Sequence, residues 1–137
     1  MIEKTFAIIK PDAVAAGKTG AIIELIEANR FTILRMQKLH LTKAQAEAFY
    51  AVHKSKPFFD ELVSYMMSGP IVVLALEKEQ AVDAWRTLMG ATNPAQASVG
   101  TLRYMFGTSI GSNATHGSDS KENAAIELKQ FFADLAV

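Results

Sequence analysis

The spacing of apolar residues predicts a strand followed by a helix in the N-terminal part of the chain. Residues 5–10, TFAIIK, are rich in β-forming residues and run directly into Pro11-Asp12, a pair typical of a turn. We therefore predict a strand that is stopped by a turn. Over residues 19–28, isoleucines recur at helical spacing, and this period predicts an amphipathic helix.

Residues 31–39 return to the alternation of a strand. The segment FTILRMQKL contains β-branched residues, and its apolar and polar positions alternate. We expect Leu34 and Met36 on one face, and Arg35 and Gln37 on the other. This alternation predicts a second strand.

Two helices are predicted between this strand and the next. Thr42 and Gln45 have the spacing of a capping box, which predicts a helix that begins there and continues to about Val52. A shorter helix is predicted over residues 58–67. The sequence Ser68-Gly69-Pro70 closes it.

The next part of the chain predicts a central strand, a helix and a long loop. Residues 71–76 form a continuous apolar run, typical of a strand at the centre of a sheet. Residues 81–89 have a helical period that stops at Gly90. Residues 91–112 have little period apart from a turn of helix expected at 102–106. A loop of this length is uncommon in a compact domain and tends to be functional.

The last periodic segment predicts a short strand and then a helix over about residues 120–135. Asp119 and Glu122 fit a capping box at the start of this helix. The helix is expected to bury Ala124, Leu128, Phe131, Phe132 and Leu135. The order of elements is an α+β pattern close to βαββαβ. Because we find no repeat or linker, we expect a single domain over residues 1–137.

Composition narrows the class of protein. Fourteen basic and fourteen acidic side chains give a formal net charge of zero, which argues against binding nucleic acid or a membrane by bulk charge. There is no cysteine, so neither a disulfide framework nor a thiolate metal site is present. The N-terminal pattern is not that of a signal peptide and no apolar run could span a bilayer, so we expect a cytoplasmic protein without a membrane partner. Apolar residues make up 50% of the chain, which hints at a subunit interface and hence a homo-oligomer.

His116 stands in the segment THGSDS, just before the last predicted helix. One interpretation is that Ser118, Asp119 and Ser120 cap this helix and that His116 is a loop residue without a chemical role. The other interpretation is that His116 is reactive, because Gly117 leaves space for a substrate and the neighbouring polar side chains can fix one ring tautomer. This stretch alone leaves both interpretations open.

Isolated cations elsewhere in the chain favour the reactive histidine. Lys10 ends the first strand, Arg86 lies late in a helix, and Arg103 lies in the long loop. The same loop also holds Thr92 and Asn113. Singly, each charge is more typical of a solvated surface, but together they form a candidate phosphate clamp. A neutral imidazole is a suitable phosphoryl acceptor, and the reaction would need Mg²⁺ on a nucleotide, held by Asp119 through water.

An ordered set of motifs resembles the nucleoside diphosphate kinase family. NATHGSDS, residues 113–120, closely resembles that family's active-site signature, N-x-x-H-G-S-D. Further segments resemble the family's motifs in order and spacing: IIKPDAV (8–14), FY (49–50), KPFF (56–59), SGP (68–70), LMGATNP (88–94) and GTLR (100–103). The resemblance spans nearly the whole chain, and a set of this kind is highly specific.

The resemblance implies both a fold and a reaction. The fold is a ferredoxin-like sandwich with an antiparallel four-stranded sheet and a long loop before the catalytic histidine. The reaction is ping-pong: a nucleoside triphosphate gives its γ-phosphoryl group to His116 at Nδ1, and a nucleoside diphosphate then takes it from the phosphohistidine. The implied partners are therefore nucleoside di- and triphosphates.

The resemblance also implies roles for individual residues. Lys10 would contact the transferred phosphate and the ribose 3′ hydroxyl, with Tyr50 supporting it, and Asn113 would contact the ribose. Phe58 would stack on the base. The residues implied to bind the β and γ phosphates are Arg86, Thr92 and Arg103. The residues implied to orient His116 through its other ring nitrogen are Glu127 and Ser118.

The chain departs from the family pattern at a few positions. Tyr104 and Met105 follow the loop arginine where a small and then a polar residue are usual. Val52 stands where many members have a carboxylate. A second functional class also stays open, namely a non-catalytic nucleotide- or nucleic-acid-binding module on the same fold. The zero net charge and the absence of an RNP-like aromatic motif argue against it.

Overall fold

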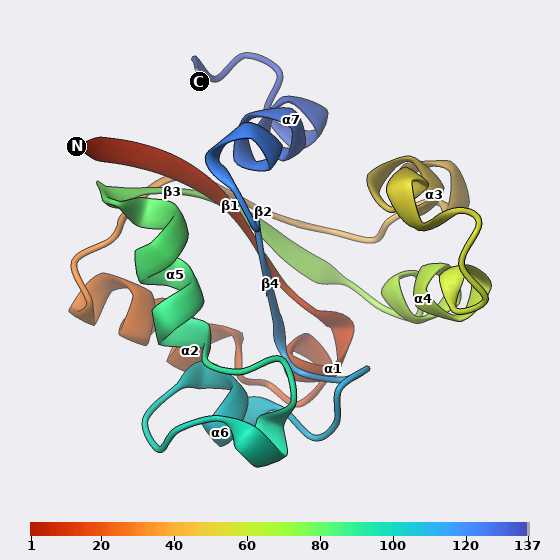
Figure 1. The fold of residues 1–137 in the computed structure, drawn as a ribbon, viewed down its shortest axis with the longest axis horizontal. Coiled ribbons are helices and arrows are strands. Elements are labelled where there is room, and N and C mark those ends of the chain that lie inside the picture. Colours follow the sequence, from red (N-terminus) through yellow and green to blue (C-terminus); the bar gives the residue numbers. More distant parts are fainter. Residues whose placement is uncertain (137) are drawn as a thin grey trace.

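The computed structural model, which describes residues 1–136, contains one antiparallel sheet (Figure 1). Its four strands are β1 (Ile2–Ile9), β2 (Thr32–Leu39), β3 (Ile71–Glu79) and β4 (Thr115–Gly117), in the spatial order β2-β3-β1-β4. Every neighbouring pair is antiparallel. The expected α+β, ferredoxin-like architecture with a four-stranded antiparallel sheet is therefore confirmed.

Helices cover both faces of the sheet (Figure 1). They are α1 (Pro11–Ala15), α2 (Thr19–Ala28), α3 (Lys43–Phe49), α4 (Phe59–Met66), α5 (Ala81–Met89), α6 (Leu102–Phe106) and α7 (Lys121–Phe131), with 3₁₀ turns η1 (Ala51–His53) and η2 (Pro94–Gln96). No helix within residues 1–136 combines the length and the apolar character needed to cross a membrane.

The central strands are buried on both faces, which explains their unbroken apolar runs. Phe6 and Ile8 of β1 point into a core shared with α3, α4 and α7, whereas Ala7 and Ile9 point into a core shared with α2, α5 and α6. Fully burying a large apolar side chain contributes about 1.5–3 kcal/mol, and Trp85 of α5 is completely enclosed. The two cores thus hold β1 and β3 rigidly beneath the loops that follow them.

The turn expected at Pro11-Asp12 is a prediction that was wrong. Helix α1 begins at Pro11, and the amides of Ala13 and Val14 donate to the Lys10 carbonyl. Proline is well suited to the first position of a helix, because its missing N–H would have had no helical partner there. The strand before it starts at Ile2, earlier than expected, and Lys10 becomes the N-cap residue of α1.

The predicted faces of β2 were also wrong, because the strand contains a bulge. Ile33 lies opposite Leu76 but Arg35 lies opposite Ala75, so Leu34 is the additional residue. Leu34 packs on the core next to α3 and α4, whereas Met36 lies on the other face and is 51% exposed. A bulge reverses the alternation beyond it, and simple periodicity does not reveal it.

The helix boundaries agree with the sequence in some places and not in others. The Thr42–Gln45 capping box is confirmed, with bonds of 2.9 and 3.2 Å, but α3 ends at Phe49 instead of Val52. Helix α7 ends at Phe131, short of Leu135, although the residues beyond it still pack on the core. The expected helical turn at 102–106 and the short strand before the last helix are confirmed as α6 and β4.

The cap of α7 is Ser120, so the Asp119–Glu122 capping box was wrong. The Ser120 hydroxyl accepts from the amide of Asn123 at 3.0 Å. Asp119 instead accepts from the side-chain amide of Asn123 at 2.5 Å. Ser118 is fully buried and takes no part in the cap. His116 and the cap are therefore separate features, and the cap does not account for the histidine.

Candidate active site

Strand β4 places His116 at the edge of the sheet. His116 lies opposite Ile8 of β1, and its carbonyl accepts a hydrogen bond from Trp85 Nε1 at 3.1 Å. Gly117 leaves room for that indole, since a Cβ at this position would lie 2.4 Å from Trp85 Cδ1. The backbone on both sides of the imidazole is thus fixed by buried neighbours.

The imidazole itself is held through one nitrogen. His116 Nε2 lies 3.1 Å from Glu127 Oε1 of α7, and Ser118 Oγ donates to the same oxygen at 2.8 Å. A carboxylate acceptor keeps the proton on Nε2, so the lone pair of the neutral ring stays on Nδ1. This arrangement brings the predicted trio of His116, Ser118 and Glu127 together. It presents Nδ1 as the available nucleophile.

A tight turn precedes the strand that carries His116. Ala114 is fully buried and has a φ of 75°, and the Thr115 amide donates to the Asn113 carbonyl at 2.9 Å. This is a γ-turn, in a conformation that residues with a side chain rarely adopt. The Lys10 amide donates to the Ala114 carbonyl at 2.8 Å, which ties the turn to the end of β1.

Lys10 and Thr92, two of the predicted ligand-binding residues, meet through the side chain of Asn113. Lys10 Nζ donates to Asn113 Oδ1 at 2.8 Å, and Asn113 Nδ2 donates to the Thr92 carbonyl at 3.0 Å. Burial, followed by repulsion from Arg103, lowers the pKa of Lys10 to about 8, although the charge of Asp12 opposes this shift. An anion bound at this ammonium would favour its charged form.

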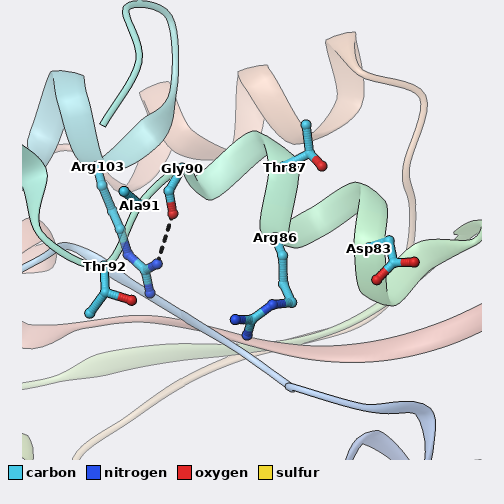
Figure 2. A pocket seen from close by; sticks show the side chains of 7 residues that line it. All are labelled: Asp83, Arg86, Thr87, Gly90, Ala91, Thr92 and Arg103. Carbon is cyan, nitrogen blue, oxygen red and sulfur yellow. Dashed lines mark hydrogen bonds between the residues drawn. The ribbon is translucent and has the colours of Figure 1, made fainter. Parts of the chain in front are cut away.

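The predicted arginines line one hollow between α5 and α6. Figure 2 shows Arg86, Thr92 and Arg103 directed toward its open space, which Asp83, Thr87, Gly90 and Ala91 complete. Arg103 donates to the carbonyls of Gly90 and Thr115, both at 3.0 Å. Burial and the nearby Arg86 lower the pKa of Arg103 to about 10. Two cations that repel each other in this way form a suitable site for a phosphate chain.

A second hollow lies over the imidazole, between α3 and α7. His116, Tyr50, Asp119 and Glu127 line it, together with Val52 and other residues of both segments. Burial and the charge of Glu127 raise the pKa of Tyr50, so its hydroxyl stays protonated near neutral pH. Tyr50 was predicted to support Lys10, but within residues 1–136 no hydrogen bond joins the two side chains, and Lys10 Nζ donates to Asn113 instead.

Asp119 lines the hollow over the imidazole and lies near enough to Arg86 to be influenced by its charge. The hydrogen bond from Asn123 lowers the pKa of Asp119, with a smaller contribution from the charge of Arg86. The carboxylate is therefore ionised at neutral pH. Among residues 1–136, no group of three or more His, Cys, Asp and Glu side chains is arranged to hold a metal ion. A metal ion bound beside Asp119 would therefore need most of its ligands from water or from a bound substrate.

Phe58 lies in a third hollow, formed by α4 and the end of the long loop. Phe58 is 46% exposed, and Ile110 of the loop is 60% exposed and lines the same hollow. The remaining lining residues are Glu61, Leu62, Tyr65, Ser109, Gly111 and Ser112. Two exposed apolar side chains in one hollow are suited to hold a flat aromatic group between them.

Sequence reasoning missed several residues of this site. Ile110 could have been noticed, because it is the only large apolar residue between Gly107 and Asn113, in a loop of small and polar residues. Asp12 belongs to the segment IIKPDAV, but its hydrogen bond to Tyr65 gave no signal, since it joins segments that are far apart in the chain. Tyr104 is 50% exposed and Met105 is 41% exposed, so both departures after the loop arginine lie at the surface.

Comparisons with known proteins identify one family. The family model described as "Nucleoside diphosphate kinase" matches residues 3–137. The chain is 58% identical to a nucleoside diphosphate kinase of Geotalea uraniireducens, covering 98% of each chain, and 55% identical to that of Desulfovibrio desulfuricans, covering 100% of this chain and 99% of the relative. Among solved structures, the Aquifex aeolicus enzyme superposes with a TM-score of 0.94 at 38% identity, covering 96% of each chain. That of Encephalitozoon cuniculi gives 0.93 at 38% identity, covering 98% of this chain and 93% of the other.

Proposed function

The chain belongs to the nucleoside diphosphate kinase family, and from this premise we propose how its own side chains carry out the reaction. The enzyme transfers the γ-phosphoryl group of a nucleoside triphosphate to a nucleoside diphosphate by a ping-pong mechanism through a phosphohistidine on His116. The alternative of a non-catalytic binding module is not favoured, because the family match extends over nearly the whole chain.

In the first half-reaction, His116 acts as the nucleophile. Nδ1 attacks the γ-phosphorus, the N–P bond forms, and the bond to the β,γ-bridging oxygen breaks so that the nucleoside diphosphate leaves. Glu127 accepts a hydrogen bond from Nε2–H, Ser118 orients the carboxylate by donating to it, and the carboxylate stabilises the positive charge that develops on the ring. The 3.1 Å contact between His116 Nε2 and Glu127 is the observation that carries this assignment. The second half-reaction is the same chemistry in reverse, with another nucleoside diphosphate as acceptor.

We propose that three cationic side chains neutralise the negative charge of the phosphate chain. Arg86 and Arg103 bind the β and γ phosphates with the Thr92 hydroxyl, and the mutual repulsion of the arginines in one hollow supports this role. Lys10 contacts the transferred phosphoryl group, and its partly buried ammonium is suited to stabilise charge on that group. Positioning and charge neutralisation are what a phosphoryl transfer chiefly requires of a protein.

We propose that the nucleoside extends from these cations to the hollow that contains Phe58. Asn113 and Lys10 contact the ribose hydroxyls, and Tyr50 contributes to the floor of the site beside the imidazole. Phe58 stacks on the base, and Ile110 covers its other face. Since every base has a π-face, stacking with few contacts to base edges accounts for tolerance of different bases.

The residues present fit a Mg²⁺ ion that arrives on the nucleotide. Mg²⁺ typically uses one or two carboxylates, several waters and substrate phosphates, and Asp119 is an ionised carboxylate at the rim of the site. We propose that Asp119 holds the ion through water. When bound, the ion neutralises charge on the phosphate chain.

The test is a measurement of the intact mass after brief mixing with Mg²⁺ and ATP, and again after a different nucleoside diphosphate is added. We expect one phosphoryl group to appear and then to disappear in the chase. The His116→Ala variant should never gain it, whereas His40→Ala, a matched change outside the three hollows, should behave as the parent. A phosphorylated His116→Ala protein would refute the assignment. The cytoplasmic location, the homo-oligomer and the single domain over residues 1–137 stay predictions.

A further inference from the structure

The side chain of Asp12 makes two hydrogen bonds that no step of the reaction uses. Asp12 lies in the first turn of α1, two residues after Lys10. Its Oδ2 accepts from the backbone amide of Ala114 at 3.1 Å, and its Oδ1 accepts from the hydroxyl of Tyr65 on α4. A single carboxylate therefore contacts the turn before His116 and a helix on the far side of the site.

The first of these bonds completes the support of the γ-turn. The Ala114 carbonyl accepts from the Lys10 amide, and the Ala114 amide donates to Asp12, so both backbone polar groups of this buried residue are bonded to the β1–α1 junction. Because Ala114 has a positive φ, the turn persists only when its surroundings hold it. Its neighbour Asn113 is the residue that bonds to Lys10 Nζ. The position of the turn therefore sets the geometry of the Lys10–Asn113 pair.

The second bond reaches the base-binding side of the site. Tyr65 lines the hollow that also contains Phe58, Ile110 and Ser112. Burial, and then the hydrogen bond to Asp12, raise the pKa of Tyr65, so its hydroxyl stays protonated and remains a donor near neutral pH. The two hydrogen bonds thus connect α4, through Asp12, to Ala114.

We propose that Asp12 is a positioning residue, which holds the turn before His116 so that Lys10 and Asn113 keep one geometry, and couples that turn to α4 through Tyr65. This inference rests on the proposed function. In the proposed reaction Asp12 contacts neither a phosphate nor His116. It acts through Lys10, Asn113 and Ala114. Its charge has a second effect, because it opposes the loss of the proton from Lys10, whereas Arg103 on α6 promotes that loss.

The first experiment separates geometry from charge by using three variants and a control. Asp12→Ala removes both hydrogen bonds, Asp12→Asn keeps hydrogen-bonding atoms but removes the charge, and Tyr65→Phe removes only the bond from α4. Asp134→Asn is the matched control, because Asp134 is 77% exposed and pairs with Arg35 away from the site. Circular dichroism establishes that each variant is folded. The rate of His116 phosphorylation by ATP and the KM for ATP are then measured.

We expect Asp12→Ala to slow His116 phosphorylation by about 10- to 100-fold, the usual effect of losing an outer supporting group. Asp12→Asn should recover most of this rate, and Tyr65→Phe should raise the KM more than it lowers the rate. In Asp12→Asn, kcat/KM should also begin to fall at a lower pH than in the parent, because Lys10 has lost a negative neighbour. A purely structural role would not move this pH profile.

The inference is overturned if folded Asp12→Ala phosphorylates His116 as fast as Asp134→Asn, or if Asp12→Asn leaves the pH profile unchanged. Should Asp12→Ala fail to fold, Asp12→Asn and Tyr65→Phe decide: parental KM, rate and pH profile in both would overturn it. Failure of the proposed function is distinguishable, because the parent protein itself would then gain no phosphoryl group.

Discussion

The two ends of the candidate active site are built differently. At the end that contains His116, several polar side chains are paired with one another, as the His116–Glu127, Ser118–Glu127 and Lys10–Asn113 hydrogen bonds illustrate. At the end that contains Phe58, the side chains offered to a ligand are apolar and largely exposed. Under the proposed function, this difference leads us to expect that the geometry of phosphoryl transfer is fixed before substrate binds, whereas recognition of the base depends on a surface that accepts many shapes.

Among the substitutions that test this comparison, a change of Glu127 should lower the catalytic rate most. In Glu127→Gln, the amide no longer obliges the proton to stay on Nε2, so a fraction of His116 has its lone pair on the wrong nitrogen. We expect kcat to fall by about 10- to 100-fold with little change in KM, as measured by steady-state kinetics. Glu122→Gln, on the same helix and exposed, is the control and should be neutral.

A rise in KM with unchanged kcat for Glu127→Gln would contradict the assignment. Such a result would mean that Glu127 binds substrate, and that it does not determine which ring nitrogen of His116 carries the proton.

The pH dependence should also differ between the two ends. The pKa of Lys10 is lowered to about 8, so the ammonium is charged below this pH and loses its charge as the pH rises above it. We therefore expect kcat/KM to be level between about pH 7 and pH 8 and to fall by about tenfold per pH unit above pH 8. Arg103, with a pKa of about 10, keeps its charge in this range.

The control for this prediction is Lys10→Arg, whose guanidinium does not titrate near pH 8. This variant is expected to be slower than the parent but to lack the fall. The ratio of kcat/KM between two bases should stay constant with pH, because Phe58 and Ile110 do not titrate. If that ratio followed the same curve, selection of the base would depend on the charge of Lys10.

The smallest effect is expected at the base-binding end. Phe58→Ala removes a stacking surface, and stacking of a base on an aromatic ring contributes about 1–3 kcal/mol. We expect KM to rise by about tenfold, by a similar factor for purine and pyrimidine nucleotides, with kcat almost unchanged. Phe58→Tyr keeps the ring and should retain the parental KM. A loss confined to one base would show that Phe58 takes part in selecting the base.

Sequence patterns were a good guide to the elements and a partial guide to the site. The helix over residues 19–28 and the helix over residues 81–89 were predicted with their observed bounds, because each has an uninterrupted apolar period. The bulge at Leu34 was not predicted, since an additional residue in a ladder depends on the partner strand. Helix α1 was taken for a turn, because Pro-Asp is compatible with both structures.

Most of the site residues implied by the family resemblance line the described hollows, whereas Lys10, Asn113 and Ser118 do not. The contacts among these residues could not be predicted. The bond from His116 to Glu127 spans one strand and one helix and is nearly local. The bonds of Asp12 to Tyr65 and Ala114 cross 53 and 102 positions of the sequence, and only the topology of the sheet brings these segments together. Arg103 also donates hydrogen bonds to two backbone carbonyls, and no sequence motif indicates these bonds.

The order of the strands has a consequence for how the protein is made. Strand β1 leaves the ribosome early, whereas β4, its neighbour in the sheet and the carrier of His116, is synthesised long afterwards. Until then, the edge of β1 that β4 will cover has no partner, and an uncovered strand edge is prone to pair with other chains. The pairing of Ile8 with His116 closes a very long loop, so it is entropically costly and is expected late in folding. We therefore expect the nascent enzyme to position its nucleophile in one of the last folding events.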